Sequence, residues 1–309
     1  MLKEVTIQLT GECNRSCPYC LAPKDNAVYI SDTDLETFNR FCKRENIDII
    51  HVTGGEPSLH PQFEKIIHTL SSVSSLVIYS NLCKKEFVGP AFQHEKSIDV
   101  LANINNRDSY TDTEWATIND NIQRLKNLGI RITFSHTFVS ETAIAEEFDR
   151  IFQLMREKEV NRLRISQALA KDDGNSGMTR QGIRCLYEYV SENIASWARC
   201  GYRVYFDCPV PVCYLPRPVF EHLYALGVIG TRCLGKLFVL PDLKVTHCYR
   251  TMDCKDSPVL TESSTYDVLM AWSRAVLEVK YSLRNTSACS HCRIIAPDSA
   301  PCGCPGYQI

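Results

Sequence analysis

The chain has 309 residues and a formal net charge of −2, because 34 lysines and arginines face 36 aspartates and glutamates. This near balance argues against a nucleic-acid or anionic-membrane partner. With 44% hydrophobic residues, the chain can bury a core large enough for one large domain and a small one. No apolar run approaches the ~18 residues of a transmembrane helix, and the first residues lack a signal-peptide apolar segment. We therefore expect a soluble, cytoplasmic protein.

Residues 1 to about 205 alternate short apolar runs with longer amphipathic ones, which predicts strands and helices in turn. The predicted strands are residues 4–9, 47–53, 76–80, 98–103, 130–138 and 162–167. The predicted helices are residues 32–46, 61–72, 113–128, 143–158 and 179–199. Strands that alternate with helices indicate an α/β fold with a parallel sheet. In a parallel β/α barrel, function gathers at the C-terminal ends of the strands.

The first predicted strand leads into a loop with three cysteines. Cys13, Cys17 and Cys20 have the spacing Cys-x-x-x-Cys-x-x-Cys, so their thiolates can reach one metal centre. A structural zinc normally takes four protein ligands, and a fully protein-held iron–sulfur cluster also takes four cysteines. The loop has no local fourth ligand, which predicts a metal site with one position left for another ligand. A zinc site with a remote fourth ligand is the alternative.

Two further segments follow the second and third predicted strands. The turn Gly54-Gly55-Glu56-Pro57 combines glycines, which let a ligand approach the backbone, with an acceptor for an ammonium group. It lacks the spacing and the lysine of a phosphate loop. Ser80-Asn81 ends the third strand. From the residues alone, the first segment is equally a tight strand-to-helix turn and the second a polar strand end.

In this order, the three segments resemble the radical S-adenosylmethionine (SAM) family. The resemblance implies that Cys13, Cys17 and Cys20 hold three irons of a 4Fe–4S cluster. The fourth iron of that cluster binds the amino and carboxylate groups of SAM. The resemblance also implies a partial (β/α)6 barrel over residues 1–205.

The same resemblance assigns SAM-binding roles around the loop. Tyr19 matches the aromatic residue usual before the third cysteine. The segment of Gly54, Gly55 and Glu56 is implied to hold the methionine amine of SAM. The implied contacts with the ribose or carboxylate of SAM come from two residues, Ser80 and Asn81.

After residue 205 the composition changes. Residues 206–218 contain too many prolines for a helix or a central strand, and indicate a linker into a small cysteine-rich domain over residues 206–309. In that domain, residues 236–248 predict a hairpin around Pro241-Asp242, and an amphipathic helix is expected near residues 266–281. The chain has 16 cysteines but no export signal, which favours metal or redox chemistry over disulfides.

Four of these later cysteines resemble an auxiliary-cluster domain called SPASM, or its shorter form, twitch. They are Cys233, Cys248, Cys289 and Cys292. Leu243 occupies the turn position where that family usually has glycine, a departure that should alter the hairpin. A four-cysteine zinc ribbon is the alternative.

Another four cysteines would complete a second auxiliary cluster: Cys208, Cys213, Cys302 and Cys304. Eight cysteines suffice for two clusters with four ligands each. The resemblance therefore implies one or two auxiliary 4Fe–4S clusters, and the spacing does not assign each cysteine to a cluster.

Cys254 lies six residues beyond Cys248, and some radical SAM epimerases return a hydrogen atom from a cysteine thiol. It is therefore our candidate hydrogen donor, with ordinary packing as the alternative. His136 and Arg164 contact substrate if their side chains face the barrel interior, which strand alternation alone does not decide. The remaining cysteines are expected to be small buried hydrophobes: Cys42, Cys83, Cys185 and Cys200.

The resemblance implies an enzyme that cleaves SAM, with one electron from the cluster, to methionine and a 5′-deoxyadenosyl radical. That radical removes hydrogen from a substrate C–H bond, and the implied reductant is a flavodoxin or ferredoxin. Because Cys13 lies so near the first residue, a preceding leader-binding domain is not expected. A small substrate, or a separate leader-peptide-binding protein, is expected instead.

We favour a peptide or peptide-like natural product that is epimerised, cross-linked or oxidised. The alternative is a twitch-type dehydrogenase or epimerase of an aminocyclitol, a sugar or another small antibiotic precursor. A non-catalytic zinc or iron–sulfur scaffold would have no use for the Gly-Gly-Glu turn, and an electron-transfer protein would not need a barrel.

Overall fold

The computed structural model describes residues 2–22, 28–93, 97–168, 177–231, 233, 235–251 and 256–283. The chain divides into two compact units. The first comprises residues 1–133 and 235–274, and the second comprises residues 134–234 and 275–309. The domain boundary predicted at residue 205 stays a prediction. No helix among the described residues is long and apolar enough to cross a membrane.

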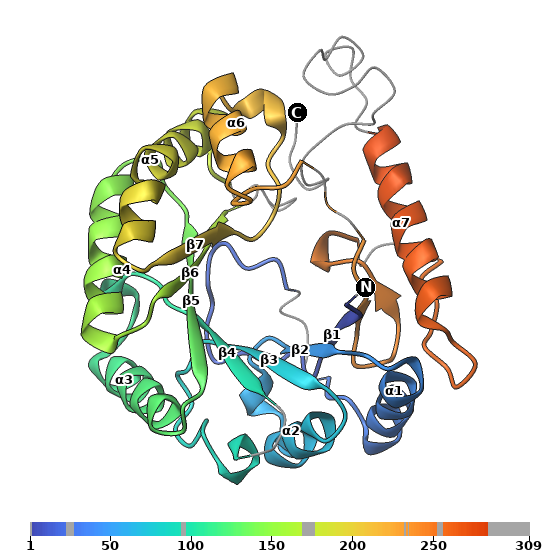
Figure 1. The fold of residues 1–309 in the computed structure, drawn as a ribbon. Helices are drawn as coiled ribbons and strands as arrows, with labels where there is room; N and C mark the ends of the chain where they lie inside the picture. The colour runs from blue at the N-terminus through green and yellow to red at the C-terminus, as the bar shows by residue number, and fades with distance from the viewer. Residues whose placement is uncertain are drawn as a thin grey trace. The chain divides into compact units, whose positions relative to one another are not determined.

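The first unit is built on a parallel sheet with the strand order β4-β3-β2-β1 (Figure 1). Its strands are β1 (Glu4–Gln8), β2 (Ile49–Thr53), β3 (Ser75–Ser80) and β4 (Ile98–Asn103). Its main helices are α1 (Asp32–Glu45), α2 (Phe63–Ser71) and α3 (Asp112–Asn127). Each agrees with its predicted range to within two residues. Buried residues alternate with half-buried ones along much of these strands, so one face of the sheet is covered more fully than the other.

Helix α1 shows why the sequence signals were reliable. The Ser31 side chain accepts a hydrogen bond from the Asp34 backbone N–H, and the acidic first turn complements the positive end of the helix dipole. Asn46 ends the helix in the left-handed conformation, with φ of 52°. Phe38 and Phe41 lie on the buried face.

The predicted hairpin also belongs to the first unit. Strand β8 (Phe238–Val239) pairs in parallel with β1 and antiparallel with β9 (Val245–Thr246). Leu243 adopts the left-handed conformation at φ of 61°, the conformation that a glycine would take there. Such strain costs about 1–2 kcal/mol, and burial of a leucine contributes about 1.5–3 kcal/mol. Because Leu243 is only 5% exposed, its burial offsets the strain.

Buried polar contacts tie the hairpin to α7 (Tyr266–Leu283). The Nδ1 atom of His247 accepts a hydrogen bond from the Lys236 backbone N–H at 2.9 Å and lies 3.3 Å from the Ser273 hydroxyl. The Ser273 hydroxyl donates to the Lys236 carbonyl at 2.8 Å. Burial lowers the pKa of His247 to about 4, so the ring is neutral and suited to this acceptor role.

The second unit holds three parallel strands in the order β5-β6-β7. They are β5 (Arg131–Phe138), whose first residues lie in the first unit, β6 (Arg162–Gln167) and β7 (Arg203–Phe206). Helices α4 (Ile144–Lys158) and α5 (Arg180–Arg199) lie on one side of these strands (Figure 1). An aromatic cluster joins the two helices, with ring centroids of Phe148 and Phe152 within 5.0 Å of that of Trp197.

The proline-rich segment was expected to be a linker, but it contains more structure. A 3₁₀ turn, η4 (Val212–Tyr214), precedes α6 (Arg217–Ala225). Pro216 caps α6 and Pro218 lies in its first turn, where a missing backbone N–H removes no helical hydrogen bond. The prediction that residues 206–218 form no α-helix is therefore wrong only for the last two of them, Arg217 and Pro218, where α6 begins.

Candidate functional site

The three-cysteine loop continues from β1 and is fastened first to the turn after β2. The Gly55 N–H donates to the Thr10 carbonyl at 2.8 Å, and the Glu56 N–H donates to the Glu12 carbonyl at 2.7 Å. A Cβ atom added at Gly55 would lie 2.3 Å from the Glu12 oxygen, and one added at Gly54 would lie 3.0 Å from the Thr10 oxygen. A side chain at either position would crowd the backbone of the cysteine loop, so the loop approaches this closely only because both residues are glycines.

The carboxylate of Glu56 joins this turn to the end of β3. It is 1% exposed. Its Oε1 atom accepts from the Ser58 hydroxyl at 2.7 Å and from the Ser80 hydroxyl at 2.9 Å. Its Oε2 atom accepts from the Asn81 backbone N–H at 2.8 Å. Burial raises the pKa of Glu56, and these hydrogen bonds oppose the rise.

Asn81 carries the connection on to the cysteine loop. Its side-chain amide donates to the Asn14 side-chain oxygen at 2.8 Å, and its own side-chain oxygen accepts from the Cys83 backbone N–H at 2.8 Å. The three segments predicted to meet at strand ends are thus in direct contact. Their predicted contacts with SAM stay predictions, because the bonds found here join the segments to one another.

Arg15, inside the cysteine loop, is held on three sides. Its guanidinium donates to the Glu114 carboxylate at 3.1 Å and to the Ser109 carbonyl at 2.6 Å, and lies 4.1 Å from the centre of the Tyr110 ring. Burial opposes its charge, but the neighbouring Tyr110, Cys83 and Glu114 raise the pKa of Arg15 overall. A fixed positive charge therefore lies within a loop of thiols, where it favours their anionic form.

A second contact set follows β4. The Tyr19 hydroxyl donates to the side-chain oxygen of Asn105, and the Asn105 amide nitrogen lies 3.9 Å from the Cys17 sulfur. The Asn105 backbone N–H donates to the Tyr110 hydroxyl at 2.9 Å. Burial raises the pKa of Tyr19, and the charge of Cys17 adds to the rise. Our sequence interpretation missed Asn105, although the rule about strand ends that selected Ser80 applies to it equally.

The three thiols themselves form a suitable donor set for a cluster. Cys13 reaches the surface, whereas Cys17 and Cys20 are half-buried. Desolvation of its sulfur by the surrounding protein raises the pKa of Cys13 to about 11. The charges of Glu56, Cys17 and Cys20 add to this rise. Iron would therefore have to displace protons on binding. Three thiols from one loop fit a 4Fe–4S cluster with one iron left open.

Among the residues that the structure describes, no three His, Cys, Asp or Glu side chains converge closely enough to hold a single metal ion. Of the predicted auxiliary-cluster ligands, Cys248 lies in the first unit, and Cys208, Cys213 and Cys233 lie in the second. Their grouping stays a prediction. Outside the described residues lie the hydrogen-donor candidate Cys254 and the other predicted ligands, Cys289, Cys292, Cys302 and Cys304.

The backbone around Cys248 is rigidly bonded. The Thr251 hydroxyl oxygen accepts from the backbone N–H groups of His247 and Cys248, both at 3.1 Å. It also lies 2.8 Å from the Thr246 hydroxyl. Thr246 and Thr251 are both buried, so these bonds are shielded from water.

The structure separates His136 from Arg164. The His136 ring is buried 3.0 Å from the Glu147 carboxylate on α4, so it lies on the helix-covered side of the strands. Arg164 bonds to the Ser135 hydroxyl and to the Asp207 carboxylate, both at 3.1 Å. Only Arg164 therefore lies on the strand face away from α4.

The other cysteines are less uniform than predicted. Cys42 is buried, as expected. The prediction is wrong for Cys200, which is exposed, and for Cys83 and Cys185, which are half-buried. The Cys83 sulfur lies 3.5 Å from the Asn81 carbonyl, and burial raises the pKa of Cys83 to about 12.

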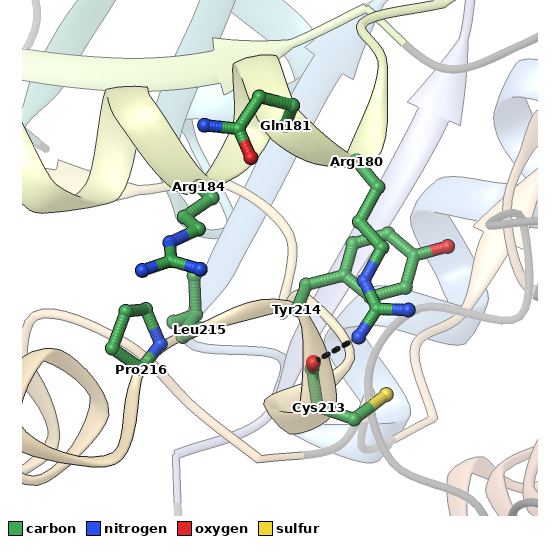
Figure 2. Close-up of a pocket in the computed structure, with 7 residues that line it drawn as sticks. All are labelled: Arg180, Gln181, Arg184, Cys213, Tyr214, Leu215 and Pro216. Carbon is green, nitrogen blue, oxygen red and sulfur yellow. Dashed lines mark hydrogen bonds between the residues drawn. The ribbon is translucent and has the colours of Figure 1, made fainter.

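The second unit contains a pocket of about 410 Å³ beside the first turns of α5 (Figure 2). Arg180 donates to the Cys213 carbonyl at 2.6 Å, and its guanidinium lies 5.0 Å from the centre of the Tyr214 ring. Arg184 contributes a second guanidinium to the lining. Two arginines favour an anionic group, and Cys213, a predicted metal ligand, also lines the pocket.

Comparison with known proteins identifies related enzymes. The family model described as the radical SAM superfamily matches residues 7–207. The structure of native anSMEcpe with bound AdoMet and Kp18Cys peptide has a TM-score of 0.69 and 15% identity, covering 98% of this chain and 89% of that chain. Streptococcus suis SuiB bound to S-adenosylmethionine has a TM-score of 0.68 and 12% identity, covering 95% and 71%. With the parallel strands, these similarities confirm the predicted α/β fold class.

Curated relatives share only part of the sequence. A probable GTP 3′,8-cyclase of Methanocella arvoryzae is 29% identical over 82 residues, which are 26% of this chain and 27% of that protein. The GTP 3′,8-cyclase of Actinobacillus pleuropneumoniae is 21% identical over 168 residues, which are 50% of this chain and 49% of that protein. The matches therefore span about half of the curated relatives' own length or less, from 12% to 49%.

Proposed function

Because the chain belongs to the radical SAM superfamily, whose members are enzymes, we propose that it abstracts hydrogen from a C–H bond of a peptide or peptide-like natural product. Epimerisation, cross-linking or oxidation would follow. The observation that carries the proposal is the frame around the cysteine loop. Backbone and side-chain hydrogen bonds join this loop to the ends of β2 and β3.

When bound, a 4Fe–4S cluster and SAM supply an electron and a 5′-deoxyadenosyl radical that removes hydrogen. Cys13, Cys17 and Cys20 would hold the cluster as thiolates. Arg15 balances part of their negative charge, and its contacts with Glu114 and Ser109 fix the loop.

The turn after β2 would receive the methionine part of SAM. Since the Glu56 carboxylate accepts from Ser58, Ser80 and Asn81, we assign the SAM ammonium to the backbone carbonyl of Gly54. The Gly54-Gly55-Glu56 turn thus keeps its predicted role of binding the SAM amine. Glu56, Ser80 and Asn81 would in addition hold this turn in place through their hydrogen bonds.

A peptide substrate is supported by two solved neighbours. One is the anSMEcpe complex with a peptide. The other is SuiB bound to its precursor peptide SuiA, with a TM-score of 0.63 and 11% identity, covering 87% of this chain and 64% of that chain. We propose that a flavodoxin or ferredoxin reduces the cluster in the cytoplasm, and that a separate protein binds any leader peptide.

The auxiliary clusters belong to the same proposal. Cys233, Cys248, Cys289 and Cys292 would hold the first 4Fe–4S cluster, which would supply an acceptor for one electron from the substrate radical. Cys208, Cys213, Cys302 and Cys304 would supply the four further thiolates that a second cluster needs, with the division of the eight cysteines between the two clusters left open. Cys254 would return a hydrogen atom if the reaction is an epimerisation.

The decisive experiment is anaerobic reconstitution with iron and sulfide, followed by incubation with SAM and dithionite. We expect 5′-deoxyadenosine and methionine in equal amounts. A fully loaded protein that forms no 5′-deoxyadenosine would refute the proposal.

A second experiment addresses the substrate. Peptides encoded beside the gene should stimulate SAM cleavage more than aminocyclitols or sugars do. Deuterium incorporation from heavy water, lost in Cys254→Ala, would identify an epimerase and its hydrogen donor.

A further inference from the structure

Tyr249 directly follows Cys248, yet its side chain reaches the turn after β2. Its hydroxyl donates a hydrogen bond to the Gly54 carbonyl at 3.3 Å. Its ring packs edge-to-face against Phe238 of β8, with ring centroids 4.9 Å apart.

The Gly54 carbonyl is the group whose direction matters most in the proposed site. Glycine restricts its backbone less than any other residue, and here two glycines follow one another. The Gly54 carbonyl and the Gly55 N–H belong to one planar peptide unit. The Gly55 bond to the Thr10 carbonyl holds one edge of that unit, and the Tyr249 bond to the Gly54 carbonyl holds the other. A carbonyl oxygen has two lone pairs and can accept from Tyr249 and from an ammonium group together.

Tyr249, the hydrogen-bond donor, lies on a backbone segment that is fixed on both sides. Strand β8 pairs with β1, the strand that leads into the cysteine loop. Thr251 fixes the two backbone N–H groups that precede Tyr249. A side chain anchored on both sides loses little further freedom when it binds the carbonyl, so the hydrogen bond acts at low entropic cost.

We propose that Tyr249 is a positioning residue of the SAM site, and that its hydroxyl, acting with the Thr10 carbonyl on the same peptide unit, holds the Gly54 carbonyl toward the methionine amine. The hairpin that carries Cys248 thus completes a site otherwise built from the N-terminal part of the chain. This inference rests on the proposed function and adds a residue that neither the cysteine motif nor the glycine turn contains.

The test is the affinity for SAM of reconstituted, oxidised protein, measured by equilibrium dialysis. Tyr249→Phe keeps the ring on Phe238 and removes only the hydroxyl. A net hydrogen bond is worth about 1 kcal/mol, so the Kd for SAM should rise about fivefold. Iron content should stay at the wild-type value, and the unfolding temperature should fall by no more than about 2–4 °C, because the hydrogen bond is also lost in the protein without SAM. In turnover, the KM for SAM should rise while kcat stays nearly unchanged.

Tyr266→Phe is the matched control, because the Tyr266 hydroxyl also donates to a backbone carbonyl, that of Glu4, at 3.4 Å. It should leave the Kd for SAM unchanged. Wild-type affinity in Tyr249→Phe would overturn the inference while leaving the proposed function intact, and so would equal weakening by both variants. A loaded wild-type protein that does not bind SAM would overturn both.

Discussion

In the first unit, the polar side chains beside the cysteine loop gather where parallel strands end, whereas in the second unit the polar cluster around Arg164 includes side chains from within the strands. Glu56, Asn81 and Asn105 follow β2, β3 and β4 and bond mainly to neighbouring loops. Arg164 and Ser135 lie within β6 and β5, and they meet Asp207 just beyond β7. Two parallel α/β units thus use their polar residues differently.

Under the proposed function, the first set would hold the cofactor and the second would meet the substrate. The strand-end groups of the first unit bond to one another and are mostly shielded, which gives a rigid frame. In the second unit, the Asp207 side chain keeps 31% of its surface exposed beside Arg164. A charged group that keeps this much exposed surface remains accessible to a ligand. We expect the two units to respond differently to mutation.

The largest effect should come from the cysteine loop. Replacing Cys13, Cys17 and Cys20 together by alanine should reduce SAM cleavage to background, because the cluster loses all its protein ligands. About four irons per chain should be lost, and at least about four should remain if an auxiliary cluster is present. Iron analysis and 5′-deoxyadenosine assays measure both. Cys200→Ala, at an exposed cysteine, should match the wild type, and loss of all iron from the triple variant would refute the auxiliary cluster.

Next in size is the effect of a single methyl group in the turn. Gly55→Ala places a Cβ atom 2.3 Å from the Glu12 carbonyl oxygen, so the cysteine loop must move. We expect more than a tenfold loss of SAM cleavage, together with weaker iron retention. Gly54→Ala is the matched comparison, since its Cβ lies 3.0 Å from the nearest oxygen and needs a smaller shift. Equal activities of the two variants would contradict this packing argument.

A third prediction tests the frame itself. In Glu56→Gln, one side-chain oxygen becomes an NH₂ group facing the donors of Ser58, Ser80 and Asn81. A buried unsatisfied donor costs about 1–3 kcal/mol, so urea unfolding should show a loss of that size. Asp207→Asn, in the more exposed second-unit pair, should cost less than about 1 kcal/mol. Similar losses at the two positions would remove the contrast between the units.

The sequence predicted most of the helices and strands, and it predicted that the cysteine loop, the glycine turn and Ser80-Asn81 would lie together. The bounds of β4 and β6 agree with prediction because apolar runs and polar strand ends are local signals. The rule that parallel strands end at one edge predicted that the cysteine loop, the glycine turn and Ser80-Asn81 would meet. The Asn81 bond to Asn14 confirms that they do.

What sequence reasoning missed depends on contacts between distant residues. Glu56 suggested an acceptor for an ammonium group, but its nearest donors include Ser80 and Asn81, which are 24 and 25 residues away. Tyr249 is 195 residues from Gly54, and only the pairing of β8 with β1 brings it there. Local periodicity carries no information about such pairs. β7 was missed because four residues give too short a pattern.

The smallest effect should be a dependence of stability on pH that comes from His60 in the first unit. Its Nε2 atom lies 3.2 Å from the Ile30 carbonyl, and its Nδ1 atom accepts from the Gln62 N–H, so the neutral ring is bonded on both sides. Burial lowers the pKa of His60, although the Ile30 bond and the charge of Asp32 oppose the shift. The unfolded chain therefore binds a proton first as the pH falls below about 6.5, and stability is lost there.

The contribution of one proton is limited to about 1.4 kcal/mol per pH unit. Urea unfolding of the wild type and of His60→Gln at pH 7.5 and 5.5 measures it. The variant should lose less stability between the two pH values, because glutamine does not titrate. A wild type whose pH dependence equals that of the variant would show that protonation of His60 costs the folded state nothing. The two hydrogen bonds of the His60 ring would then not require the neutral form of the ring, although their geometry indicates that they do.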